Sequence, residues 1–182
     1  NTTEGINIVA NGLKWRKTDK IVTTVLEHHS NFIVWLRVRD KCGAKVTVVM
    51  PREPVEEGLL NVSDFERAID DRTRLVAITH VSNVLGVITP IEEIAKIAHE
   101  HGALVLVDAA QSVPHMPVDV QKLDIDFLAF SGHKMCAPTG SGALFMREEV
   151  QKEVEPLYIG GGTIEDVNVD NYRLEEGVGR FE

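Results

Sequence analysis

The sequence predicts an α/β domain with a mostly parallel sheet flanked by helices. Strand-like apolar runs alternate along the chain with segments of helical periodicity, which is typical of this class. Several of the apolar runs are continuous and rich in β-branched residues, as expected for strands that are covered on both faces. The length of 182 residues is sufficient for one domain with a sizeable core.

Six short apolar runs are the predicted strands. They are Ile21–Leu26, Lys45–Val49, Leu75–Thr79, Leu104–Val107, Phe127–Phe130 and Ala143–Met146. Two helices between them have clear start signals, because capping-box patterns occur at Ser63–Glu66 and Thr89–Glu92. Pro90 is the predicted first residue of the second helix, and Gly102 is expected to end it. From about Gly160 onward the periodicity is lost, so we expect a loop or a crossing segment there.

The composition is that of an ordinary globular protein, with 43% hydrophobic and 26% charged residues. The formal net charge of −9 argues against nucleic acid or an anionic membrane as the main partner. No apolar run approaches the roughly 18–20 residues that span a bilayer. The two cysteines, Cys42 and Cys136, form no metal-binding pattern and favour a reducing cytoplasm, although the sequence alone leaves a disulfide open.

Polar residues follow four of the predicted strands at the point where each strand ends. In open α/β sheets, ligands bind beyond the carboxyl ends of the strands. The sequence therefore predicts a site built from Glu27–His29, His80–Asn83, Asp108–Gln111 and Ser131–Lys134.

Two of these residues have a chemistry that matches a cofactor with a positively charged ring. Asp108 ends a buried strand, where its carboxylate can hold a protonated ring nitrogen; a helix N-cap or an ion-pair partner is the alternative. Lys134 lies in a glycine-flanked strand exit, where an amine can become a Schiff-base nucleophile; a solvated surface lysine is the alternative. Ser131 and His133 can donate hydrogen bonds to a phosphate.

Other groups extend this hypothesis. Thr2 and Thr3 open a helix whose free N–H groups can bind an anion, or they serve as simple N-caps. At most one of His28 and His29 faces the site, and we expect its ring to stack on an aromatic cofactor, whereas the other is structural.

A metal site is not expected, because the ligand spacing is absent. The run Gly160–Gly162 lies outside the strand–turn–helix context of a dinucleotide site. These patterns predict an anionic, aromatic cofactor at the strand ends.

The sequence resembles the class V aminotransferase superfamily, and within it the SufS-type cysteine desulfurases. The resemblance covers the whole chain, and seven short motifs carry it in order. They are Thr2-Thr3-Glu4-Gly5-Ile6-Asn7, Glu27-His28-His29-Ser30-Asn31, Thr79-His80-Val81-Ser82-Asn83-Val84-Leu85-Gly86, Val107-Asp108-Ala109-Ala110-Gln111, Ser131-Gly132-His133-Lys134, Gly160-Gly161-Gly162 and Arg180-Phe181-Glu182.

The resemblance implies the fold type I architecture of enzymes that use pyridoxal 5'-phosphate (PLP), usually a homodimer with active sites near the subunit interface. Residues 1–182 correspond to the PLP-binding large domain, and we expect the chain to be a piece of a longer protein whose C-terminal small domain is missing. The implied roles are Schiff-base lysine and acid/base for Lys134, ring stacking for His28, and binding of the ring nitrogen for Asp108. Asn83 and Gln111 correspond to the region of the ring hydroxyl. The phosphate would be held by Thr3, Ser131 and His133, with Thr2 near it. The triple glycine and the chain end correspond to segments that approach the partner subunit's site.

The implied reaction converts L-cysteine to L-alanine and passes the sulfur, as a persulfide, towards a sulfur-acceptor protein, as in iron–sulfur cluster assembly. The persulfide cysteine and the substrate-binding arginine of the family lie beyond its Arg-Phe-Glu motif, so we interpret Cys136 and Cys42 as structural. The alternatives are another enzyme of the superfamily (a selenocysteine lyase, an aminotransferase or an epimerase) or a non-catalytic fragment with the PLP fold.

Overall fold

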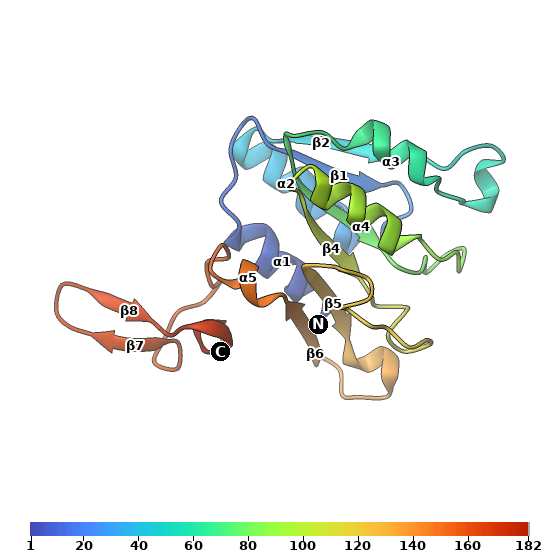
Figure 1. Ribbon diagram of the computed structural model, residues 1–182. Coiled ribbons are helices and arrows are strands. Elements are labelled where there is room, and N and C mark those ends of the chain that lie inside the picture. Colours follow the sequence, from blue (N-terminus) through green and yellow to red (C-terminus); the bar gives the residue numbers. More distant parts are fainter. Residues whose placement is uncertain (182) are drawn as a thin grey trace.

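The structure is a computed structural model that describes residues 1–181, apart from the side chain of Glu56. Its centre is a six-stranded sheet with the strand order β2-β1-β3-β4-β5-β6 (Figure 1). The strands are β1 (Lys20–Thr24), β2 (Lys45–Val49), β3 (Thr73–Thr79), β4 (Leu104–Asp108), β5 (Phe127–Ser131) and β6 (Gly142–Met146). The pairs from β2 to β5 are parallel, and β6 runs antiparallel to β5. The predicted fold class and all six strands are thus confirmed, and no strand bound is shifted by more than two residues.

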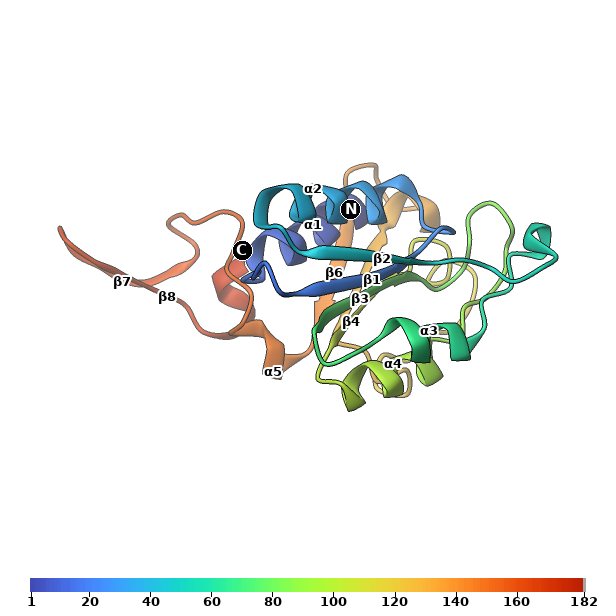
Figure 2. The same ribbon diagram turned by 90° about the horizontal axis from the view of Figure 1, so that it is seen from above.

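Helices cover both faces of this sheet. They are α1 (Thr2–Gly12), α2 (Ile33–Cys42), α3 (Val62–Ala68), α4 (Ile91–Glu100) and the short α5 (Glu148–Gln151). Figure 2 shows α1 and α2 on one face of the sheet and α3 and α4 on the other. Short 3₁₀ turns lie at His29–Asn31, Val55–Glu57, Gly132–Met135 and Gly177–Phe181. Among the described residues, no helix is both long and apolar enough to cross a membrane.

Each face of the sheet has its own hydrophobic core. On the α1/α2 face the fully buried Ile6 and Trp35 pack against β-strand residues such as Leu106. On the α3/α4 face Phe65 and Ile94 pack in the same way. Because apolar residues from both sides of β3, β4 and β5 are buried, these strands are continuously apolar in the sequence.

The helix starts differ from the prediction in detail. Helix α3 begins two residues earlier than the capping-box pattern indicates, because the side chain of Asn61 accepts the hydrogen bond of Ser63 N and thereby caps the helix. Pro90 is the N-cap of α4 and not its first helical residue. Gly102 does follow the helix end, with a left-handed φ of 71°, as predicted.

The prediction for the end of the chain is wrong in part. Strands β7 (Ile164–Val167) and β8 (Tyr172–Leu174) form an antiparallel hairpin that stands away from the main sheet in Figure 1. Its turn is held by Asn168, whose side-chain oxygen accepts hydrogen bonds from Asp170 N and Asn171 N at 3.0 Å. The hairpin is largely exposed, so its strands lack the buried apolar alternation by which a strand is predicted. Glu182, the last residue of the Arg-Phe-Glu motif, lies outside the described residues.

Candidate active site

A cavity of about 170 Å³ lies at the carboxyl edge of the parallel strands. All nine residues predicted for the site line it, namely Thr2, Thr3, His28, Asn83, Asp108, Gln111, Ser131, His133 and Lys134. They come from the start of α1 and from the exits of β1, β3, β4 and β5. The convergence follows from the parallel sheet, because parallel strands end at the same edge.

The start of α1 forms one wall of the cavity. Thr2 N donates a hydrogen bond of 2.8 Å to Ser131 Oγ, and the two hydroxyl groups share a second hydrogen bond of 2.7 Å. A Cβ on Gly5 would lie 3.1 Å from the Cβ of Ala129, so a side chain there would push the helix slightly away from β5. The side chain of Asn1 caps the helix by accepting from Glu4 N, which leaves both threonines free of the predicted N-cap role.

His28 is held by the turn that follows β1. Its Nδ1 accepts a hydrogen bond of 3.1 Å from Ser30 N, and Ser30 Oγ accepts one of 2.9 Å from Thr3 Oγ1. Neutral His28 therefore carries its proton on Nε2. His29 does not line this cavity but a neighbouring hollow, so only one of the two histidines faces the predicted site.

Asp108 is the last residue of β4 and is only 4% exposed. Its Oδ1 accepts a hydrogen bond of 2.9 Å from Ala110 N. Burial raises the pKa of Asp108, while the Ala110 N–H and the nearby charges of Lys134 and His28 act in the opposite direction. No ion pair to Asp108 occurs among the described residues, so this wall of the cavity is a buried carboxyl group that can accept a cationic partner.

Lys134 and His133 lie in the 3₁₀ turn Gly132–Met135, directly after β5. This turn ends at Cys136, which has a left-handed φ of 64° and is exposed. Its exposed side chain is not packed in the core, which argues against the interpretation of Cys136 as structural. Cys42 is the last residue of α2 and is half-buried. Neither cysteine lines the cavity.

The sequence analysis assigned no role to three polar residues of this region, although Glu27 belongs to one of the segments predicted for the site. Ser30 and Thr79 line the cavity, and Glu27 lies buried beside it. Glu27 accepts hydrogen bonds from Thr24 Oγ1, Asn31 Nδ2 and Thr79 N. Burial raises the pKa of Glu27 to about 8, against the effect of these donors, and the charge of Asp108 raises it further. The signal for Glu27 in the sequence is its carboxyl side chain directly before His28.

The surroundings of the cavity leave room for a further group. A hollow of about 410 Å³ adjoins it and shares His28 and Asn83 with it. Within the described part of the chain, no group of three or more His, Cys, Asp or Glu side chains is arranged to hold a metal ion. The cavity thus combines hydroxyl, imidazole and amine groups with a buried carboxyl group.

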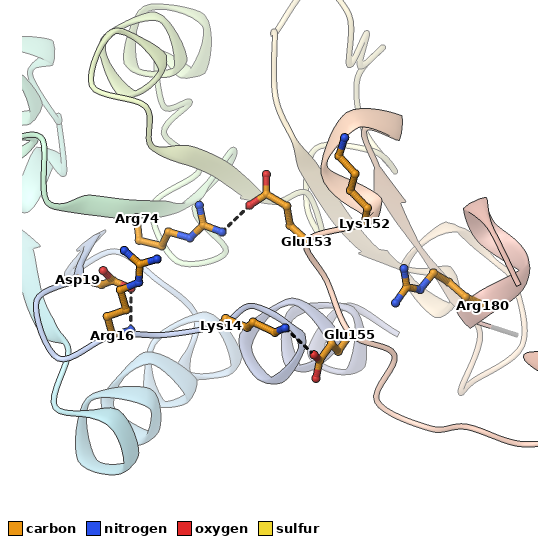
Figure 3. A pocket seen from close by; sticks show the side chains of 8 residues that line it. All are labelled: Lys14, Arg16, Asp19, Arg74, Lys152, Glu153, Glu155 and Arg180. Atoms are coloured by element: carbon orange, nitrogen blue, oxygen red, sulfur yellow. Dashed lines mark hydrogen bonds and ion pairs between the residues drawn. The ribbon is translucent and has the colours of Figure 1, made fainter. Parts of the chain in front are cut away.

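A larger pocket of about 570 Å³ lies at the opposite, amino edge of the sheet (Figure 3). Its charged side chains include the ion pairs Lys14–Glu155 at 3.1 Å and Arg74–Glu153 at 2.6 Å. Arg180, the arginine of the Arg-Phe-Glu motif, lines this pocket and not the cavity that contains Lys134.

Comparison with known proteins agrees with this arrangement. A probable cysteine desulfurase of Methanothermobacter thermautotrophicus is 50% identical over the whole chain. The apo structure of a cysteine desulfurase from Thermococcus onnurineus superimposes on the whole chain with a TM-score of 0.93 and 51% identity. A structure of C-DES with glycine covalently linked to its PLP cofactor matches the whole chain with a TM-score of 0.88 and 29% identity.

The chain spans about 45% of the length of the first two of these relatives and 49% of the third. The family model of the class-V aminotransferases matches residues 1–182. The chain therefore belongs to the class-V aminotransferase family.

Proposed function

We propose that the chain is the PLP-binding large domain of a cysteine desulfurase. The observation that carries the proposal is the convergence of hydroxyl, imidazole, amine and carboxyl groups from five separate segments in one cavity. The relatives named cysteine desulfurase, at 42–51% identity over essentially the whole chain, support the choice of reaction.

The groups present in the cavity fit PLP at both of its ends. Asp108 is a buried carboxyl group without an ion-pair partner among the described residues, and it would hold the protonated ring nitrogen. At the other end, the start of α1 with Thr2 and Thr3, together with Ser131 and His133, would hold the phosphate. The Lys134 amine would bind the aldehyde carbon. Bound PLP supplies an electron sink for bond breaking at the substrate's α-carbon.

The remaining residues orient the reaction. His28 would stack on the ring, and Asn83 and Gln111 would bind the region of the ring hydroxyl. Lys134 would take the proton from the α-carbon of L-cysteine and return one. The adjoining hollow beside His28 gives the substrate a place next to the ring. The C–S bond of the substrate breaks, the sulfur passes to a thiolate as a persulfide, and L-alanine leaves.

A homodimer is part of the same proposal. Hydrophobic side chains are exposed in the loop after β3, where Val84 is 80% and Ile88 62% exposed, beside the mouth of the cavity. Apolar surface of this kind is typical of an interface. Sedimentation of the purified protein, with Val84→Asp as the disrupting variant, tests this point.

We further propose that the enzyme acts in the cytoplasm and delivers its sulfur to an acceptor protein of iron–sulfur cluster assembly. Transfer of labelled sulfur from L-cysteine to a candidate acceptor is the corresponding measurement.

The reaction class is tested by product analysis. A full-length protein containing this chain should release alanine and persulfide sulfur from L-cysteine. Pyruvate-dependent amino transfer without sulfur release would instead identify an aminotransferase, and activity confined to selenocysteine would identify a lyase. Cys136→Ser serves as the matched control, because Cys136 does not line the cavity and the variant should keep full turnover.

A further inference from the structure

We propose that Glu27 is a positioning residue, whose carboxyl group fixes the turn that carries His28 to the strand end beside Asp108. The inference deepens the proposed function, since it concerns the two groups that would hold the cofactor ring.

Glu27 joins three segments at the carboxyl edge of the sheet. Its Oε1 accepts hydrogen bonds from Thr24 Oγ1 at 2.8 Å and from Thr79 N at 3.0 Å. Its Oε2 accepts one from Asn31 Nδ2 at 2.6 Å. Thr24 ends β1, Thr79 ends β3, and Asn31 belongs to the turn between β1 and α2. One buried side chain, 8% exposed, therefore connects two strand ends and a turn.

Both ends of this connection lie next to groups of the site. His28 follows Glu27 directly and belongs to the segment between Glu27 and Asn31. Thr79 lines the cavity and pairs with Asp108 across β3 and β4. The distance between His28 and Asp108 sets the width of the slot for the cofactor ring, which would stack on His28 and be held at its nitrogen by Asp108. Glu27 is the side chain that ties the two sides of this slot together.

The hydrogen bonds around Glu27 have a fixed direction. Trp35 Nε1 donates to Asn31 Oδ1 at 3.2 Å, and an indole N–H can only donate. The amide nitrogen of Asn31 therefore faces Glu27, and Trp35 is fully buried and cannot turn away. When the carboxyl group of Glu27 is ionised, above its pKa of about 8, both of its oxygens thus face donors, so the position needs a group with two acceptors.

This direction makes specific substitutions informative. In Glu27→Gln the new amide nitrogen faces a hydrogen-bond donor in either orientation. A flip of the Asn31 amide would relieve this, but the amide nitrogen of Asn31 would then face the indole N–H of Trp35. At a pH above the Glu27 pKa of about 8, Asn31→Asp sets a second carboxylate against the ionised Glu27 and is also unfavourable. The double variant Glu27→Gln/Asn31→Asp restores the pattern, because the amide at position 27 donates to the carboxylate at position 31, which still accepts from Trp35.

The experiment is carried out at about pH 9, where Glu27 is ionised. It measures PLP affinity and, in the cofactor-free, isotope-labelled protein, the ring resonances of His28. Each single variant should weaken PLP binding by roughly tenfold, the scale of one unmet buried hydrogen bond, and should shift the His28 resonances. The double variant should return to within about threefold of the original affinity, with the original His28 resonances. Glu93→Gln, an exposed change of the same type on α4, should alter neither quantity.

A second control separates positioning from general destabilisation. Ile94→Ala opens the core on the opposite face and lowers the melting temperature. Well below that temperature it should leave PLP affinity and the His28 resonances unchanged. Unchanged affinity and resonances in Glu27→Gln, or a double variant as impaired as the single ones, would overturn the proposal. Failure of the unmodified protein to bind PLP would refute the proposed cofactor, while the His28 resonances would still decide the role of Glu27.

Discussion

The two edges of the six-stranded sheet carry pockets of different construction. At the amino edge, a pocket of about 570 Å³ is lined by charged side chains, several of which are paired with one another (Figure 3). At the carboxyl edge, a cavity of about 170 Å³ brings together hydroxyl, imidazole and amine groups with a buried carboxyl group that has no ion pair among the described residues. In the larger pocket several charged side chains form ion pairs with one another. In the smaller cavity polar groups are available to bind a ligand.

The difference shows where a site is to be sought in such a fold. Ion pairs between exposed side chains contribute about 0–1 kcal/mol to stability, and their charges are already paired within the protein. A buried carboxyl group without a cationic partner lowers the stability of the fold. Such a group is typical of a binding site, where the ligand supplies the cationic partner. The comparison predicts that substitutions at the carboxyl edge change ligand binding, while those at the amino edge change stability alone.

The largest effect is expected for Asp108→Asn. An amide cannot hold a ring N–H⁺ as a carboxylate does, and the loss of one charge-assisted hydrogen bond costs about 1.5–3 kcal/mol of binding free energy. In the absence of PLP, Asp108→Asn should not lower the stability of the protein. Because burial raises the pKa of Asp108, its ionisation lowers stability as the pH rises through that pKa, so the asparagine variant should unfold no earlier at pH 7.

Calorimetry with and without PLP measures both effects in one protein. A variant that binds PLP as well as the original protein would remove Asp108 from the role assigned to it, and would weaken the contrast between the two edges.

A smaller effect, on stability alone, is expected for His99→Asn at the amino edge. His99 Nε2 lies 2.9 Å from Asp126 Oδ2, and Nδ1 lies 3.2 Å from Asp124 Oδ2. The hydrogen bond with Asp126 is the main cause that raises the pKa of His99 above 6.5. A raised pKa means that the stabilisation is complete below pH 6.5 and is lost as the pH rises through the folded-state pKa.

Denaturant unfolding of His99→Asn should therefore show a deficit of about 1.5 kcal/mol near pH 6 that shrinks towards pH 9. A deficit that grows with pH would contradict the assigned protonation. PLP affinity should be unchanged throughout.

The smallest effect is expected for Arg74→Ala, which removes the ion pair with Glu153 in the amino-edge pocket. Both side chains are partly exposed, so the free energy of unfolding should fall by less than about 1 kcal/mol, and less still in high salt. The matched variant Glu153→Gln should behave in the same way. A loss of PLP binding in either variant would show that the two edges are coupled.

The sequence predicted the sheet and the set of site residues because both follow from local patterns. Continuous apolar runs predicted the strands, and the polar residues at their ends converge wherever the strands are parallel. Glu27 was placed at a strand exit, but its role could not be predicted, because one of its hydrogen-bond donors, Thr79 N, lies 52 residues away in the chain. The N-cap Asn61 was missed because the pattern beginning at Ser63 also satisfies the capping rule, and only the structure shows which side chain accepts the hydrogen bond.

The assignment of the carboxyl edge as a PLP site is tested most directly by locating the covalent attachment. The purified protein would be incubated with PLP, reduced with borohydride, digested and examined by peptide mass spectrometry. We predict that the modified lysine is Lys134, that Lys134→Ala abolishes the modification while retaining the fold, and that Lys152→Ala, a change in the amino-edge pocket, leaves it intact. Modification of another lysine, or persistence of the reduced adduct in Lys134→Ala, would contradict the assignment.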